Sequence, residues 1–197
     1  DAGMGKTRCI DELSALAGGR GFASFSGRSF EAVCNPVFWP WIQILRQVGE
    51  AVPAQAEAAR ALEARLSQER AGDDAASLES ADRYWQYEAL VAFLAELARV
   101  RPLLLTFDNL HWADAGSWEL LGYLGPELRR LPLFVLAARR EGRAEKARSR
   151  SFPPLRDAER FKLPALSREF LTRTMSGSTL SSVRLAVAAG DFSYQFE

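Results

Sequence analysis

The chain has 197 residues, of which 48% are hydrophobic and 25% are charged, so it is long enough to bury one sizeable core. Lys plus Arg and Asp plus Glu both number 25, and this balance excludes a bulk charge that would attract nucleic acid or a membrane surface. No apolar run approaches the ~20 residues of a membrane-spanning helix, and the two cysteines, Cys9 and Cys34, are too few for a disulfide framework or a zinc site, so we expect a cytoplasmic protein.

Helical and strand-like segments alternate along the chain. Apolar residues recur at helical spacing in the longer segments, whereas the short segments are continuous or alternating apolar runs. In chain order we expect a helix over 5–17, a strand over 21–27, helices over 41–48, 54–70 and 80–100, a strand over 103–107, a helix over 115–129 and a strand over 131–138. Such alternation requires right-handed crossovers and a parallel sheet covered on both faces. The predicted fold class is therefore α/β.

Two groups of large apolar side chains are candidates for the core. The helix over 80–100 has an expected buried stripe made of Trp85, Leu90, Phe93, Leu94 and Leu97. The end of the irregular segment 28–40 and the first residue of the next expected helix contain an aromatic cluster, Phe38, Trp39 and Trp41. These rings could stack on a nucleotide base or dock a partner domain, but packing beneath the loop is the favoured interpretation.

The chain opens with a glycine-rich loop that leads into a helix. The letters DAGMGKT match all but the first position of the pattern G-x-x-x-x-G-K-[ST], so we expect a fragment of a longer protein whose first strand is missing. Backbone N–H groups of such a loop surround phosphates, Lys6 would bridge the β- and γ-phosphates, and the Thr7 hydroxyl would bind Mg²⁺. The predicted nucleotide-binding residues are Asp1, Ala2, Gly3, Met4, Gly5, Lys6, Thr7 and Arg8, with Asp108 downstream.

Asp108 follows the apolar strand over 103–107, as the carboxylate of a Walker B motif does. The carboxyl end of a parallel strand is where open α/β sheets bind ligands, and a carboxylate there can reach Mg²⁺ through water. Each motif taken alone has a plainer interpretation. The loop could be a glycine turn before a helix, and Asp108 could be a turn residue of the kind common at strand ends. Together, in this order, they predict a site for ATP and Mg²⁺ in which Thr7 and Asp108 hold the metal.

Beyond these motifs, the chain resembles the STAND-type AAA ATPase modules of large bacterial transcriptional regulators and cyclase-associated signalling proteins. The segments that carry the resemblance are DAGMGKTRCIDEL, GRSFEAVCNPVFWPWIQILR, LLLTFDNLHWAD and LFVLAARRE. The resemblance implies a P-loop NTPase three-layer sandwich with a mostly parallel sheet over 1–150. It also implies an edge strand and the start of a small helical subdomain over 151–197.

In that family the nucleotide sets the orientation between the ATPase core and other domains of the same polypeptide. The resemblance therefore implies ATP and ADP as ligands and output and sensor domains as partners, without direct contact to nucleic acid or membrane, and it leaves open a nucleotide-dependent oligomer. Arg140 matches the sensor arginine after the strand that follows Walker B. A solvent-facing arginine in the basic loop is an equally good interpretation of that residue.

The chain departs from the family pattern in two places. Asn109 stands where a second acidic residue usually follows the Walker B aspartate, and an amide cannot take a proton from an attacking water. His111, Asp114 and Glu31 are the side chains that could polarise water instead, although none is assigned a catalytic role. Near the end, the letters GDFS replace a Gly-Asn-Pro-Phe segment, so no function is assigned beyond about Ser167, which leaves residues 176–197 without a role.

Three functional hypotheses follow. The leading one is a regulatory switch that binds Mg-ATP and hydrolyses it slowly. The second is a nucleotide-binding scaffold in which Asn109 has removed hydrolysis. The third, a P-loop kinase, is the least favoured because no acceptor-binding lid is recognisable in the sequence.

Overall fold

A computed structural model describes residues 6–31, 36–68, 79–126, 128 and 130–139. In chain order its elements are α1 (Lys6–Gly19), β1 (Ala23–Arg28), α2 (Trp39–Ala51), the 3-10 turn η1 (Pro53–Gln55), α3 (Ala56–Gln68), α4 (Glu79–Val100), β2 (Leu103–Asp108), the 3-10 turn η2 (Leu110–Trp112), α5 (Ala115–Leu124) and β3 (Leu133–Ala137). Within these residues no helix is both long and apolar enough to cross a bilayer. The edge strand and helical subdomain expected over 151–197 lie outside the described residues.

The three strands form one parallel sheet in the order β1-β2-β3. All six residues of the central strand β2 are buried, as its uninterrupted apolar run predicts. Arg28 of β1 lies opposite Asp108 of β2, and Leu103 of β2 lies opposite Leu133 of β3. Because the strands are parallel, their carboxyl ends share one edge of the sheet. The predicted α/β class is confirmed.

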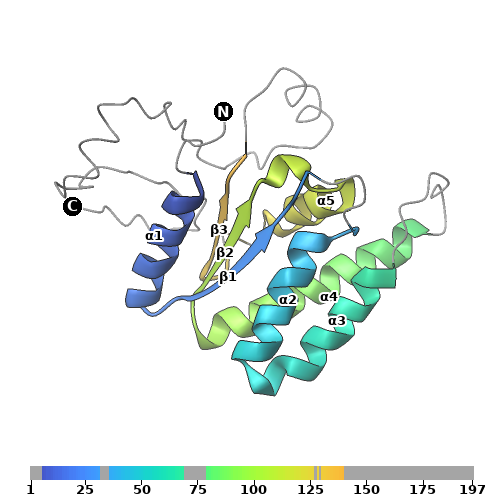
Figure 1. The fold of residues 1–197 in the computed structure, drawn as a ribbon. Coiled ribbons are helices and arrows are strands. Elements are labelled where there is room, and N and C mark those ends of the chain that lie inside the picture. The colour runs from blue at the N-terminus through green and yellow to red at the C-terminus, as the bar shows by residue number, and fades with distance from the viewer. Residues whose placement is uncertain (1–5, 32–35, 69–78, 127, 129, 140–197) are drawn as a thin grey trace.

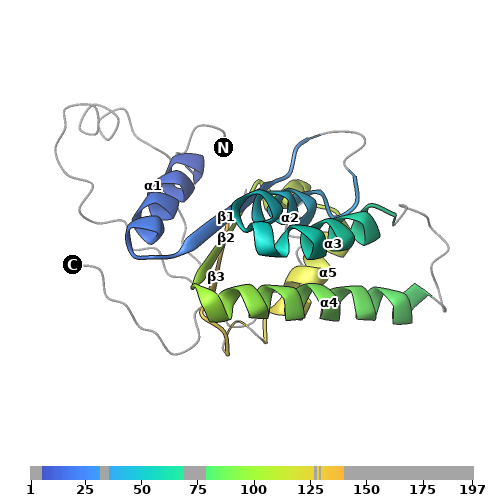
Figure 2. The same cartoon turned by 90° about the horizontal axis from the view of Figure 1, so that it is seen from below.

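Among the described elements, helices lie on both faces of the sheet, and more of them on one face than on the other. Figure 1 shows α1 on one face and α2, α3, α4 and α5 on the other, and Figure 2 shows the same three layers from below. Side chains alternate along β2, so Leu103, Leu105 and Phe107 point into the larger helical layer. The side chain of Asp108, which follows Phe107, points to the opposite face of the sheet, toward α1. The alternation therefore separates the core face from the face that carries the candidate site.

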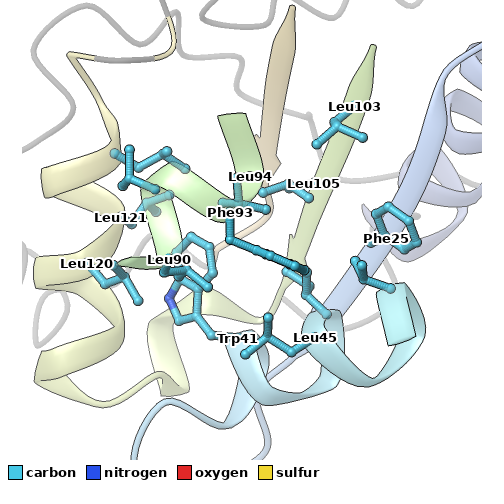
Figure 3. Close-up of a cluster of buried hydrophobic side chains, with 14 of the residues drawn as sticks. Phe25, Trp41, Leu45, Leu90, Phe93, Leu94, Leu103, Leu105, Leu120 and Leu121 are labelled. Carbon is cyan, nitrogen blue, oxygen red and sulfur yellow. The ribbon is translucent and has the colours of Figure 1, made fainter. Parts of the chain in front are cut away.

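The main core lies between the sheet and α2, α4 and α5 (Figure 3). Phe38 and Trp41 are almost completely buried in it, and the Trp41 ring packs edge-on against Phe107 with 4.8 Å between ring centroids. The Trp41 indole N–H also donates to the Ser117 carbonyl at 3.2 Å. Trp39 is half-buried under the guanidinium of Arg46. Packing beneath the loop, the favoured interpretation of Phe38 and Trp41, is confirmed.

Two details of the helices differ from the prediction. Trp85 is 66% exposed, because the buried stripe of α4 passes through Tyr87, Leu90, Leu94 and neighbouring residues. Trp85 precedes Leu90 by five positions, which turns it ~140° away from that stripe. α5 ends at Leu124 instead of continuing through residue 129, since Pro126 has no N–H to extend the helix.

Side chains of α2 cover the outer edge of β1. The Gln47 amide accepts from the Ser26 N–H at 2.9 Å and donates to the Ser26 carbonyl at 2.6 Å. One helical turn earlier, Gln43 makes the same pair of bonds with Arg28, at 3.2 and 2.8 Å. The two amides thus substitute for a neighbouring strand, which protects an edge that could otherwise pair with another chain. They also fix the backbone of Arg28 beside Asp108.

The close approach of β1 to α2 predicts a large effect for Gly27→Ala. A Cβ built on Gly27 would lie 2.3 Å from the backbone oxygen of Pro40, so the strand and the helix would have to separate. We expect a loss of about 1–3 kcal/mol or more in the free energy of unfolding, measured by urea denaturation followed by tryptophan fluorescence. Gly49→Ala is the matched control, because its Cβ would meet Ala59 at an ordinary 3.6 Å, and it should be neutral or stabilising by up to about 1 kcal/mol. Equal effects of the two substitutions would contradict the tight contact.

Candidate functional site

The candidate site lies where the carboxyl end of β2 meets the first turn of α1. Asp108 is the last residue of β2, and Thr7 is the second residue of α1. The Thr7 hydroxyl donates to Oδ2 of Asp108 at 2.9 Å, although the two residues are 101 positions apart in the sequence. The structure therefore brings together the two side chains that the sequence proposes as metal ligands.

Each oxygen of the Asp108 carboxylate has a partner. Oδ1 accepts the Asn109 N–H at 2.9 Å, while Oδ2 accepts the Thr7 hydroxyl and lies 3.0 Å from the Arg28 guanidinium. The Asp108 side chain is 8% exposed, whereas that of Arg28 is 46% exposed. Since buried carboxylates are stable only with such partners, these contacts orient Asp108 toward α1.

Asn109 shapes the turn that leaves β2. Its φ of 55° and ψ of 36° place it in the left-handed region, which asparagine tolerates better than most residues with a side chain. In this conformation its N–H points back to the Asp108 carboxylate. The local geometry thus accommodates asparagine at the position where the family pattern has an acid.

The residues after Asn109 mainly make contacts that stabilise the chain between β2 and α5. Asp114 caps α5: its carboxylate accepts the N–H and the hydroxyl of Ser117, at 2.9 and 2.6 Å, and also the Phe38 N–H at 3.1 Å. His111 is buried in η2, with its ring 5.0 Å from that of Trp112. Glu31 is exposed on the loop after β1. The contacts of Asp114 and His111 are those of structural residues.

The remaining predicted site residues are distributed as follows. Lys6 is the first residue of α1, while residues 1–5 and Arg140 lie outside the described residues. Arg8 is exposed on α1 and pairs with Glu12 at 3.4 Å, one turn along the helix. Burial, and then the charge of Glu12, raises the pKa of the nearby Cys9 thiol, which disfavours the thiolate nucleophile.

The donor set of Thr7 and Asp108 fits Mg²⁺. Both offer hard oxygen atoms, and neighbouring oxygens in an octahedral shell with Mg–O distances of ~2.1 Å lie ~3 Å apart. The observed separation between the Thr7 hydroxyl and Asp108 Oδ2 is 2.9 Å. Among the residues that the structure describes, no three His, Cys, Asp or Glu side chains gather to enclose a metal by themselves. The arrangement suits an ion that takes its other ligands from phosphates and water.

Sequence reasoning missed Arg28. The residue lies at the carboxyl end of β1, and only the register between β1 and β2 places it opposite Asp108. The available signal was a basic residue at the end of the strand before Walker B. That signal points to Asp108 only when the two strands are known to be direct neighbours in this register.

Comparison with known proteins agrees with this geometry. The family model described as AAA ATPase domain matches residues 1–136, which include Thr7, Arg28, Asp108, the strands β1 and β2 and all of β3 except its last residue. Searches of curated proteins and of solved structures found no match. The matched region is most of the chain, and ATPase domains of this family bind nucleotides. The chain therefore belongs to the AAA ATPase domain family.

Proposed function

We propose that this domain binds Mg-ATP at the carboxyl edge of its sheet, hydrolyses it slowly and acts as a regulatory switch within a multidomain signalling or transcriptional regulator. The observation that carries the proposal is the 2.9 Å hydrogen bond between the Thr7 hydroxyl and Asp108. It joins the helix that follows the glycine loop to the end of a buried strand. This is the arrangement in which a P-loop residue and a Walker B aspartate hold one metal ion.

The roles of the residues follow from their positions. The loop over residues 1–5 and the amino end of α1 would surround the phosphates with backbone N–H groups, and Lys6 would add a positive charge. Thr7 and Asp108 would hold Mg²⁺, which supplies charge neutralisation at the phosphates when it is bound. The hydrogen bond from the Asn109 N–H to Asp108 keeps the carboxylate oriented.

The wider context of the proposal rests on the resemblance to STAND-type modules. The core would extend to about residue 150 and continue into the helical subdomain over 151–197. The partners would be other domains of the same polypeptide in the cytoplasm, and Arg140 would act as the sensor of the γ-phosphate. The preference for ATP over GTP is supported by the family, since none of the described contacts reads adenine.

Calorimetric titration of the purified chain with ATP tests the proposal. We expect saturable binding in the presence of Mg²⁺ and weaker binding in excess EDTA, because the metal links the phosphates to Thr7 and Asp108. Competition with GTP measures base preference in the same experiment. Absence of saturable binding in folded protein at any Mg²⁺ concentration would refute the proposal.

The scaffold alternative is favoured by Asn109, which offers no proton acceptor. Asn109→Asp distinguishes the two candidates, and the left-handed conformation at this position tolerates aspartate. If the missing acid limits turnover, release of phosphate should rise by ~10²-fold or more, the usual contribution of a positioned general base. Asn109→Ala, which restores no acid, is the control. An unchanged rate in Asn109→Asp would contradict the idea that this position limits hydrolysis.

A further inference from the structure

One oxygen of Asp108 is shared between Thr7 and Arg28. The Thr7 hydroxyl lies 2.9 Å from Oδ2, and the Arg28 guanidinium lies 3.0 Å from the same atom. The other oxygen, Oδ1, is occupied by the Asn109 N–H. A metal ion held between Thr7 and Asp108 would therefore approach the oxygen that Arg28 already contacts.

Two cations cannot share this oxygen without repulsion, because the Asp108 carboxylate carries only one negative charge. Arg28 is the partner that can move. Its guanidinium is half-exposed and can be solvated by water, whereas Asp108 is buried at the end of the central strand. An ion pair with one exposed partner is also weak enough to be displaced.

The backbone of Arg28 is fixed by hydrogen bonds, whereas its half-exposed side chain pairs with Asp108 through the guanidinium. Gln43 binds both the N–H and the carbonyl of Arg28, and β1 lies in register with β2 on the other side. Displacement of the guanidinium therefore requires only rotation of the side chain. The strand and the rest of the site would keep their positions.

We propose that Arg28 competes with Mg²⁺ for Asp108 and so sets the Mg²⁺ concentration at which the domain binds ATP. This inference rests on the proposed function, since it concerns the same site. Arg28 acts here as a regulatory residue, because it occupies the metal's acceptor and need not touch the nucleotide. The domain would then bind Mg-ATP less readily at low Mg²⁺ than Thr7 and Asp108 alone would allow.

The test is the Mg²⁺ dependence of ATP binding in Arg28→Gln. Calorimetric titrations of the 197-residue chain at a series of Mg²⁺ concentrations give the midpoint at which ATP affinity rises. We expect this midpoint to fall by about tenfold in Arg28→Gln, because the competing charge is gone. Arg28→Lys keeps the charge, so its Mg²⁺ midpoint should stay near that of the wild type. Arg46→Gln is the matched control, since Arg46 is 51% exposed and pairs with Glu63 on α3.

The outcomes separate the inference from the proposed function. A wild-type chain that binds no ATP at any Mg²⁺ concentration overturns both. A wild type that binds, combined with an unchanged or raised midpoint in Arg28→Gln, overturns only the inference. Equal weakening of ATP binding by Arg28→Gln with Mg²⁺ and in EDTA also overturns it, because Arg28 would then be a phosphate ligand. Thermal unfolding of each variant shows that the fold is intact.

Discussion

Replacing Asp108 with asparagine should remove most of the Mg²⁺ dependence of ATP binding. The substitution keeps the size of the side chain and an oxygen that can accept the Asn109 N–H. It removes the negative charge that Thr7 and Arg28 both contact, and Asp108 is the only carboxylate in these contacts. Metal affinity should fall by ~10- to 100-fold, as it does when a carboxylate that supports a bound metal is lost.

Calorimetry at saturating Mg²⁺ and in EDTA separates the metal from the nucleotide. In EDTA, the affinity of the Asp108→Asn chain for ATP should equal or exceed that of the wild type, since an anion no longer faces the phosphates and Arg28 loses its partner. Asp11→Asn makes the same change of charge at an exposed position of α1 and should bind Mg-ATP normally. Full Mg²⁺ dependence in Asp108→Asn would place the metal elsewhere.

The sequence predicts those parts of the site that depend on local pattern. Thr7 belongs to a motif that specifies both a loop and the start of a helix, and Asp108 ends a short apolar run of the kind found in buried strands. Their approach follows from the α/β class, because helix starts and parallel strand ends share one edge of the sheet. The alternation of strands with helices along the chain and the burial of β2 were predictable from the same kind of pattern.

The contacts that sequence reasoning missed depend on register and on the rotation of helices. Arg28 meets Asp108 only because β1 and β2 are aligned residue by residue, and no local pattern encodes that alignment. Gln43 and Gln47 face the edge of β1 because of how α2 is rotated on the sheet. Trp85 was misplaced for a related reason: a large aromatic residue at the start of α4 was assigned to the stripe although its angular position excludes it.

A second contact between distant segments joins the loop after β1 to the turn after β2. The buried Phe38 has a φ of 59°, an uncommon conformation for a large side chain, and its N–H donates to Asp114 at 3.1 Å. The ring of Phe38 packs against Gly116, where an added Cβ would lie only 2.7 Å from it. Asp114 therefore holds the strained start of α2 against the start of α5, next to the turn that carries Asn109.

Asp114→Ala should accordingly destabilise the fold by about 2–4 kcal/mol, the sum of a lost helix cap and a buried N–H left without an acceptor. Urea unfolding followed by tryptophan fluorescence measures the loss. Asp114→Asn keeps an oxygen for the Ser117 N–H but offers only one acceptor atom, so its loss should be intermediate. Asp11→Ala, at an exposed position, should change stability by less than about 0.5 kcal/mol. If Asp114→Ala instead kept full stability and lost phosphate release, Asp114 would be a group that polarises water, and its contacts with Ser117 and Phe38 would be incidental.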